Sequence, residues 1–179
     1  MNYLGKETTF QWLGHATFLV GTPSGRKVLF DPWLGNPSCP EQYQDPEDVD
    51  LILLTHGHSD HIQDVIPQAK KHGCRVVCNV ELAFWLKKLG LPEDQVVEMN
   101  KGGSIEICGL FITMTDAKHS SSIEVDGVLQ YGGEPAGFVV ETENEFRFYY
   151  AGDTCVFSDM ALIGELHAPT LAILPMGDH

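Results

Sequence analysis

The sequence predicts a protein of the α/β class, on the basis of two neighbouring patterns. Leu51 to Leu54 are four consecutive large apolar residues, which is typical of a central strand that is buried on both faces of its sheet. From Ile62 to Ala69, apolar residues recur at helical spacing. Together the two patterns predict an α/β sheet in which this strand lies near the centre.

The other elements follow from local composition, taken in chain order. Three β-rich runs open the chain, and the turn residues between them predict an antiparallel meander. Later β-rich runs predict strands, and two further stretches predict helices, one of which stops at Gly90. We expect strands over residues 8–13, 16–20, 27–30, 51–54, 75–78, 96–99, around 105, 111–114, 138–140, 146–150 and 171–174 (the last one buried), and helices after 61 and over 80–89 and 159–166.

Composition limits the classes of function. The chain has 179 residues, about the size of one domain, so residues 1–179 are expected to form a single domain. A formal net charge of -14 argues against nucleic acid as a partner, because nucleic-acid backbones require basic patches. The five cysteines are odd in number and scattered, which favours reduced thiols in a cytoplasmic protein. No apolar run approaches the length of a membrane span.

The heptapeptide over residues 55–61, THGHSDH, directly follows the predicted buried strand. Open α/β sheets usually place their sites at the carboxyl ends of strands. His56 and His58 are two residues apart, so in an extended segment both side chains project to the same side. Asp60 and His61 can face a neighbouring point as the chain turns into the helix. The heptapeptide can thus offer two nitrogens to one metal ion, and an oxygen plus a nitrogen to a second.

The ligand types indicate which metals are suited to the heptapeptide. Neutral imidazole and carboxylate suit zinc, manganese or iron, and the lack of cysteine argues against a closed structural zinc site. We therefore expect one or two divalent metal ions, with zinc preferred. The alternative is a solvated polar turn with incidental histidines, which the density of ligands behind a buried strand disfavours.

The heptapeptide resembles the H-x-H-x-D-H signature of the metallo-β-lactamase superfamily. This resemblance implies an αββα sandwich with one or two metal ions in a cleft between the sheet edges. The segments WLGHAT around His15, LFDPW around Asp31, YGGEPAGF from Tyr131 and AGDT around Asp153 are similar to one branch of the superfamily. That branch holds ascorbate-6-phosphate lactonase-like proteins, the phospholipase D that acts on N-acyl phosphatidylethanolamine, and uncharacterised metal-dependent hydrolases.

The resemblance also implies the remaining ligands. Asp153 follows a predicted strand and a glycine; from the residues alone it could be a bridging ligand or a helix N-cap, and the resemblance implies the ligand. The superfamily expects a third histidine before this aspartate. Only His72 and His119 lie in that interval, and His72 fits a helix C-terminus, which leaves His119. The resemblance thus implies one ion on His56, His58, His119 and Asp153, and another on Asp60, His61 and Asp153.

Six further residues are expected near the ligands. His15 and Asp31 are expected to orient the ligands, with satisfied turn residues as the alternative. Trp33 and Tyr131 are expected at the rim of the cleft, with core aromatics as the alternative. Ser120 fits a donor to a polar substrate or a solvated turn. The last of the six, His179, fits a substrate-side residue or a frayed terminus.

The end of the sequence departs from the superfamily pattern. Relatives continue with a strand and a helix, and these carry a histidine that completes the second metal site. The resemblance therefore implies a C-terminally truncated domain that lacks its last strand and helix. We expect a truncated form, a gene fragment or one part of a split protein. Such a chain is expected to associate with itself or with a chain that carries the missing segment.

The leading functional hypothesis is a metal-dependent hydrolase that acts on a small molecule. A metal-bound hydroxide would attack a lactone or a phosphodiester, with His56, His58 and Asp60 at the reaction centre. The alternative is a catalytically impaired metal-binding fragment or subunit that needs a C-terminal partner segment. A nuclease is the third possibility, and the acidic charge balance counts against it.

Overall fold

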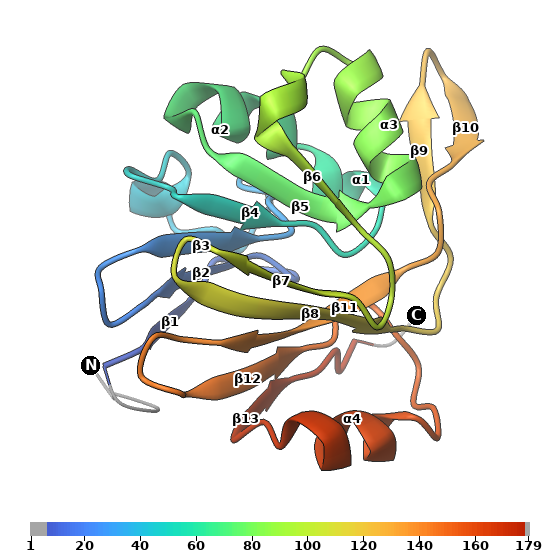
Figure 1. Ribbon diagram of the computed structural model, residues 1–179. Coiled ribbons are helices and arrows are strands. Elements are labelled where there is room, and N and C mark those ends of the chain that lie inside the picture. The colour runs from blue at the N-terminus through green and yellow to red at the C-terminus, as the bar shows by residue number, and fades with distance from the viewer. Residues whose placement is uncertain (1–6, 178–179) are drawn as a thin grey trace.

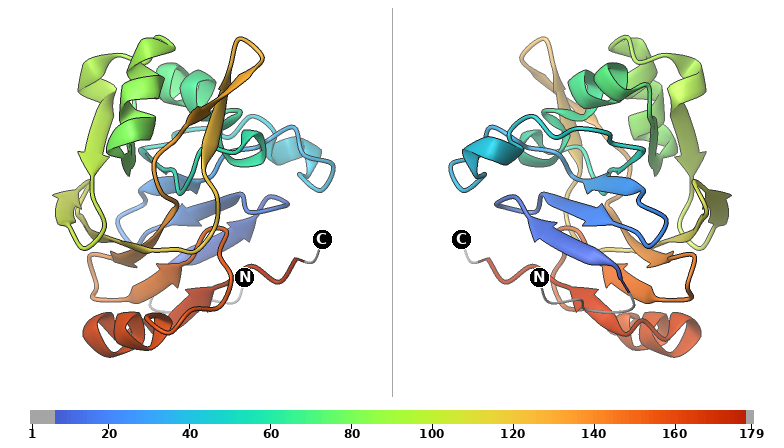
Figure 2. Two further views of the ribbon diagram at one scale, coloured as in Figure 1. Left: turned by 90° about the vertical axis from the view of Figure 1, so that its right-hand side faces the viewer. Right: turned by 90° about the vertical axis from the view of Figure 1, so that its left-hand side faces the viewer.

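The computed structural model describes residues 7–177, and it contains two β-sheets that face each other (Figure 1). One sheet has six strands in the order β1-β2-β3-β4-β5-β6, and the other has five in the order β13-β12-β11-β8-β7. Helices lie on the outer side of each sheet, as the side views show (Figure 2). The layers are therefore helix, sheet, sheet and helix, which confirms the predicted αββα sandwich.

The six-stranded sheet begins with the predicted meander. Its first three strands pair antiparallel, and β3 to β6 then run parallel, with β4 near the centre. All three residues of β4 are buried, as its apolar run predicts. The strands are β1 (Thr9–Trp12), β2 (Phe18–Gly21), β3 (Lys27–Phe30), β4 (Leu51–Leu53), β5 (Arg75–Asn79) and β6 (Val96–Met99).

The five-stranded sheet is antiparallel except at one edge. The strands predicted over residues 138–140 and 146–150 form the antiparallel hairpin of β11 and β12, and β13 pairs parallel to β12. The strands are β7 (Ser104–Ile107), β8 (Leu110–Asp116), β11 (Ala136–Glu141), β12 (Arg147–Tyr150) and β13 (Leu171–Ile173).

The main core lies between the two sheets. Phe30 from β3 packs edge-on against Phe148, at a ring-centroid distance of 5.9 Å, and lies 4.7 Å from the ring of Tyr150. A second cluster fills the space between the six-stranded sheet and helices α1 (Ser59–Ile62), α2 (Val65–His72) and α3 (Val80–Lys88). Helix α4 (Met160–His167) covers the outer face of the other sheet through Ile163.

The predicted helix after His61 is two helices, because tertiary hydrogen bonds hold Asp64, one of the two residues between them. The carboxylate of Asp64 accepts the backbone N–H of Leu34 at 2.7 Å, and the backbone N–H of Asp64 donates to the carbonyl of Pro32 at 3.0 Å. Its backbone leaves the helical region there, with φ of -103° and ψ of 6°. The chain restarts as α2 with Pro67 in the first turn, where a missing N–H costs nothing.

A hairpin of β9 (Ser122–Val125) and β10 (Val128–Tyr131) was not predicted. Its turn is Asp126-Gly127, and both residues have positive φ values, of 52° and 75°. An Asp-Gly pair of this kind is a strong hairpin signal, so the sequence did contain the information. Short 3-10 turns lie at Glu41–Tyr43 and Glu93–Gln95.

The last strand is less buried than its apolar run predicts. Leu171 and Ile173 are half-buried, Ala172 is exposed, and Leu174 lies beyond the strand with 49% of its surface exposed. The reason is its position, because β13 pairs only with β12 among the described strands and lies at the edge of the sheet. Only an interior strand is shielded on all sides.

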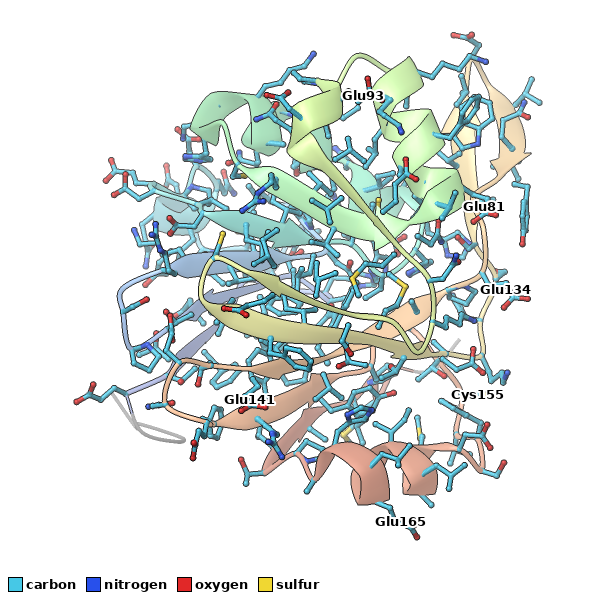
Figure 3. The ribbon with its side chains drawn as sticks, viewed as in Figure 1. Glu81, Glu93, Glu134, Glu141, Cys155 and Glu165 are labelled. Carbon is cyan, nitrogen blue, oxygen red and sulfur yellow. The ribbon has the colours of Figure 1, made fainter. Side chains whose placement is uncertain are left out.

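Acidic residues are distributed over the surface of the molecule. Figure 3 shows Glu81 on α3, Glu93 on the second 3-10 turn and Glu165 on α4 at separate points on the outside of the molecule. The negative charge is thus spread over both helical layers. Among residues 7–177, no helix has the length and apolar character to cross a membrane.

Candidate metal centre

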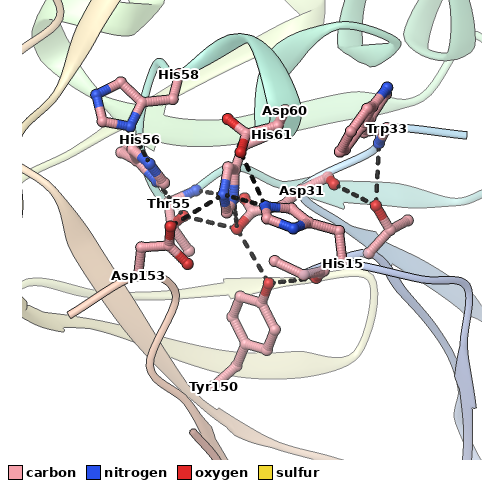
Figure 4. Close-up of polar contacts among 12 residues, drawn as sticks. His15, Asp31, Trp33, Thr55, His56, His58, Asp60, His61, Tyr150 and Asp153 are labelled. Carbon is pink, nitrogen blue, oxygen red and sulfur yellow. Dashed lines mark hydrogen bonds and ion pairs between the residues drawn. The ribbon is translucent and has the colours of Figure 1, made fainter. Parts of the chain in front are cut away.

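Two groups of polar side chains meet where the carboxyl ends of β4 and β12 face each other (Figure 4). The heptapeptide after β4 supplies four of these side chains, and His15 reaches them from the turn between β1 and β2. Asp31 follows β3, His119 follows β8 and Asp153 follows β12. The site therefore draws on both sheets, and no single element contains it.

The first cluster consists of His56, His58 and His119, with one ring nitrogen from each lying within 4.8 Å of the others. The closest pair is Nε2 of His56 and Nδ1 of His58, at 3.0 Å. Ser120 stands beside this cluster, with Oγ 3.3 Å from Nε2 of His58. The structure therefore brings together three histidines that are up to 63 residues apart in the sequence.

Proton accounting in the first cluster assigns the tautomer of His56. The hydroxyl of Thr55 lies 2.6 Å from Oδ2 of Asp31 and 3.0 Å from Nδ1 of His56. A hydroxyl has one proton, and the shorter contact to the carboxylate takes it. The hydroxyl oxygen then accepts the Nδ1–H of His56. This leaves a lone pair on Nε2 of His56, the atom that faces His58.

The second cluster consists of His15, His61 and Asp153, whose ligand atoms also lie within 4.8 Å of one another. Nε2 of His61 is 3.3 Å from Oδ2 of Asp153 and 3.3 Å from Nε2 of His15. The carboxylate of Asp60 lies 3.0 Å from Nε2 of His15. His15, which was expected to orient the ligands, therefore stands directly beside them, and Asp60 contacts this cluster through it.

Asp153 lies between the two clusters. Its Oδ2 atom is 3.3 Å from Nε2 of His61 and 3.7 Å from Nε2 of His119. The preceding Gly152 has φ of +62°, and a Cβ atom at that position would lie 2.7 Å from Cγ2 of Thr55. Only glycine fits this close approach, so Gly152 is what allows Asp153 to reach both groups of histidines.

Asp31 is fully buried beneath the second cluster and accepts hydrogen bonds from the segment after β4 and from helix α1. Its carboxylate accepts the backbone N–H of Thr55 at 2.8 Å and the Nδ1–H of His61 at 2.9 Å. From the opposite sheet, the hydroxyl of Tyr150 lies 3.0 Å from Oδ2 of Asp31 and 2.5 Å from the carbonyl of Ala16. Asp31 thus orients His61 so that its Nε2 atom faces Asp153.

Burial and charge give the two clusters different protonation. Burial, followed by the charge of His61, lowers the pKa of His56 to about 3, and burial followed by His119 lowers the pKa of His58. These two imidazoles are therefore neutral at pH 7, the state that binds a metal ion. Burial alone would also lower the pKa of His61, but Asp31 and Asp153 outweigh it and raise that pKa to about 10.

The pKa of the Asp153 carboxyl is lowered for the same reason. Burial raises it, but the hydrogen bond and the charge of His61 outweigh burial. The metal-free protein thus neutralises the carboxylate of Asp153 with the His61 proton. Three imidazoles in one cluster, and two imidazoles with a carboxylate in the other, form a donor set that fits divalent cations such as zinc.

Trp33 and Tyr131, two other predicted residues, lie outside both clusters. Trp33 contacts the edge of His15, with ring centroids 5.4 Å apart. Tyr131 lies on β10 with 65% of its surface exposed, and its carbonyl accepts the indole N–H of Trp85, so it is not part of either cluster. His179 lies outside the described residues. Tyr150 was missed as a site residue because its sequence run, RFYY, is that of an ordinary strand.

Comparison with known proteins identifies the family. The β-lactamase superfamily domain matches residues 26–178 of the chain. A UPF0173 metal-dependent hydrolase of Roseiflexus sp. (strain RS-1) is 45% identical over the whole chain, which spans 75% of that relative. Its counterpart in Koribacter versatilis is 49% identical over 94% of the chain and 72% of the relative.

Solved structures agree with the sequence relatives. A metallo-hydrolase from the archaeon Ignicoccus hospitalis has 32% sequence identity and a TM-score of 0.81, over 96% of this chain and 72% of that one. An isothiocyanate hydrolase from Delia radicum gut bacteria shares the fold, with a TM-score of 0.70 at 21% identity over 91% of this chain and 69% of that one. The chain therefore belongs to the metallo-β-lactamase superfamily and, within it, to the UPF0173 metal-dependent hydrolases.

Proposed function

We propose that this metal-dependent hydrolase acts on a lactone or a phosphodiester, with divalent cations held by the two histidine clusters. The observation that carries the proposal is the convergence of five imidazoles and one carboxylate at the facing edges of two sheets. His56, His58 and His119 would hold one cation. His61 and Asp153 would hold the other, with His15 as a further donor, and Asp153 is close enough to both clusters to be shared.

Zinc is the cation we propose for these sites. Imidazole and carboxylate ligands in the absence of thiolate are typical of catalytic zinc sites, which keep one position open for water or substrate. A bound divalent cation polarises the scissile group and lowers the pKa of a water molecule from 15.7 to about 7.

The residues of the chain supply orientation and proton transfer. Asp31 holds His61 in one tautomer through Nδ1, and Thr55 does the same for His56. Asp60 and His15, 3.0 Å apart and each about one-third exposed, form a pair at the open side of the second cluster. We assign to Asp60 the proton that the leaving group needs, because His15 is the further donor to the second cation and the carboxyl group of Asp60 is open to solvent.

The test combines metal analysis with an activity panel. The protein would be purified without chelators and its zinc, manganese and iron measured by mass spectrometry. We expect zinc at up to two ions per chain, and hydrolysis of a lactone or of a phosphodiester in a panel that also includes a β-lactam. Loss of activity on dialysis against a chelator, with recovery on adding zinc, would support the proposal. Full activity in protein with no metal would refute it.

A metal-binding protein without turnover is the second candidate. The first cluster has three histidines of its own, whereas the second depends on Asp153, which also faces His119. A chain that binds one ion tightly at the first cluster and hydrolyses nothing in the panel would fit this candidate. The stoichiometry of tightly bound metal therefore distinguishes the two.

A further inference from the structure

A cleft of about 810 Å³ opens directly beside the second cluster. His15, His119 and Asp153 form one part of its lining, and Tyr150 contributes from the end of β12. From there the cleft passes between the first two strands and the segment that follows β13, which the side views show on the same side of the molecule (Figure 2). A substrate that reaches the clusters through this cleft contacts the wall that these two segments form.

This wall is apolar. Trp12, Leu174 and Met176 line the cleft and leave 53%, 49% and 94% of their surfaces exposed. Phe18 and Pro175 extend the same wall. Large apolar side chains that gather around a cavity indicate a binding surface, because covering them removes apolar area from water at about 25 cal/mol per Å².

Thr154, a polar residue in the lining of the cleft, already has hydrogen-bond partners. The hydroxyl of Thr154 accepts the backbone N–H of Lys118 at 2.9 Å and donates to the carbonyl of Cys155 at 2.8 Å. Cys155 is exposed beside them (Figure 3). The hydroxyl of Thr154 therefore has no proton to spare for a sugar or another polyhydroxylated ligand.

The cleft is also poor in positive charge. Among the described residues that line it, Lys118 is the only lysine or arginine. Its ammonium pairs with the carboxylate of Asp116, which also accepts Lys101. Asp153 adds a negative charge at the inner end, and the chain as a whole carries -14. Apart from this ion-paired Lys118 and any bound metal ion, no lysine or arginine among the described lining residues balances the charge of a phosphate diester.

We infer that the substrate is a neutral lactone or carboxylic ester that carries an apolar arm of several carbon atoms, and that this arm lies between Trp12 and Met176. This inference rests on the proposed function and decides between its two substrate classes. Hydrolysis consumes one water: its oxygen bonds to the acyl carbon, the acyl C–O bond breaks, and the released oxygen takes a proton to become an alcohol. No oxidant or other co-reactant is needed.

The first experiment compares γ-butyrolactone with γ-nonalactone, which differ by a pentyl arm, on the zinc-loaded protein. A fully buried CH₂ group is worth about fourfold in affinity, so a half-buried pentyl arm should raise kcat/KM about 30-fold. Bis(p-nitrophenyl) phosphate serves as the phosphodiester and should be the poorer substrate. Equal kcat/KM for the two lactones, or a preference for the phosphodiester, would overturn the inference.

Substitutions of residues that line the cleft test where the apolar arm of the lactone lies. Met176→Ser, at a highly exposed side chain, should lower the γ-nonalactone to γ-butyrolactone ratio of kcat/KM about threefold. Trp12→Ala should lower it about tenfold, although its indole N–H also donates to the carbonyl of His15. Leu129→Ala is the matched control, because Leu129 is 70% exposed on β10 and does not line the cleft. An unchanged ratio in Met176→Ser and Trp12→Ala would place the arm elsewhere and contradict the inference.

Calorimetry separates this inference from the proposed function. Metal-free protein should bind γ-nonalactone more tightly than γ-butyrolactone, and Met176→Ser should weaken only the former. Binding of this kind without any hydrolysis would support the apolar cleft and refute the lactonase reaction. Hydrolysis without any dependence of kcat/KM on the length of the arm would support the reaction and refute the apolar cleft.

Discussion

Nδ1 of His61 lies 2.9 Å from Oδ2 of Asp31, and both side chains are fully buried. A carboxylate behind a ligating imidazole fixes the tautomer of the ring and makes its other nitrogen a stronger donor. The contact therefore links the second cluster to the strand end after β3, 30 residues earlier in the chain.

Replacement of Asp31 tests this link. Asp31→Asn should weaken zinc binding at the second cluster by about 10- to 100-fold and leave the first cluster nearly unchanged, because the charge behind His61 is lost. Competition with a chromophoric chelator would measure both affinities. Asp126→Asn in the β9–β10 turn is the control, since asparagine suits that turn equally well. Equal loss at both clusters would show that Asp31 acts on the fold as a whole.

Metal binding at the first cluster should depend on His56. His56→Ala should remove at least one bound metal ion per chain and reduce hydrolysis by more than 100-fold, because the ring lies between His58 and His61. His72→Ala, at the end of α2, should change neither, since His72 contacts Gln68 of its own helix. Metal content equal to wild type in His56→Ala would show that this histidine is not a ligand.

Gly152 offers a test that leaves every proposed ligand in place. Gly152→Ala should lower zinc affinity at both clusters about tenfold or more, because its Cβ atom would overlap Thr55 and displace Asp153. Gly164→Ala on α4 is the matched control, as nothing lies within 4 Å of the added methyl group. That control should raise stability by about 0.5–1 kcal/mol. Zinc titration and thermal unfolding would measure the two effects.

Metal binding should release a proton from the second cluster but none from His56 and His58 of the first. At pH 7 His61, with a pKa of about 10, is protonated, and a metal ion that takes Nε2 displaces one proton. His56 and His58 have lowered pKa values and lose none. Calorimetry in buffers of different ionisation enthalpy should show about one proton released by the second cluster, whose affinity falls as pH falls. Binding heats that are independent of the buffer would contradict this.

The sequence allowed the fold class and most residues of the candidate site to be predicted, for physical reasons. Leu51 to Leu53 form a buried strand because a short unbroken apolar run, followed at once by polar turn residues, suits a strand covered on both faces. His56 and His58 share one side because residues two apart in an extended segment must. Both statements depend only on local geometry, which a sequence contains in full.

Long-range placement could not be predicted in the same way. His15 lies beside His61 because the β1–β2 turn reaches over the end of β4, and His15 has a positive φ of 47° there. Neither the approach nor the backbone angle has a signature in neighbouring residues. Tyr150 reaches Asp31 across the sandwich, from 119 residues further along the chain. Such contacts depend on how the two sheets pack.

The contact of Tyr150 with both Asp31 and Ala16 also bears on how the protein opens. It connects the inner faces of the two sheets at the point where the histidines gather, so parting the sheets there also withdraws the support of His61. A metal ion bound at the second cluster should therefore be released more readily when the two sheets separate there. The residence time of a metal ion at the second cluster should then reflect how often the two sheets separate. It should be shorter in Tyr150→Phe.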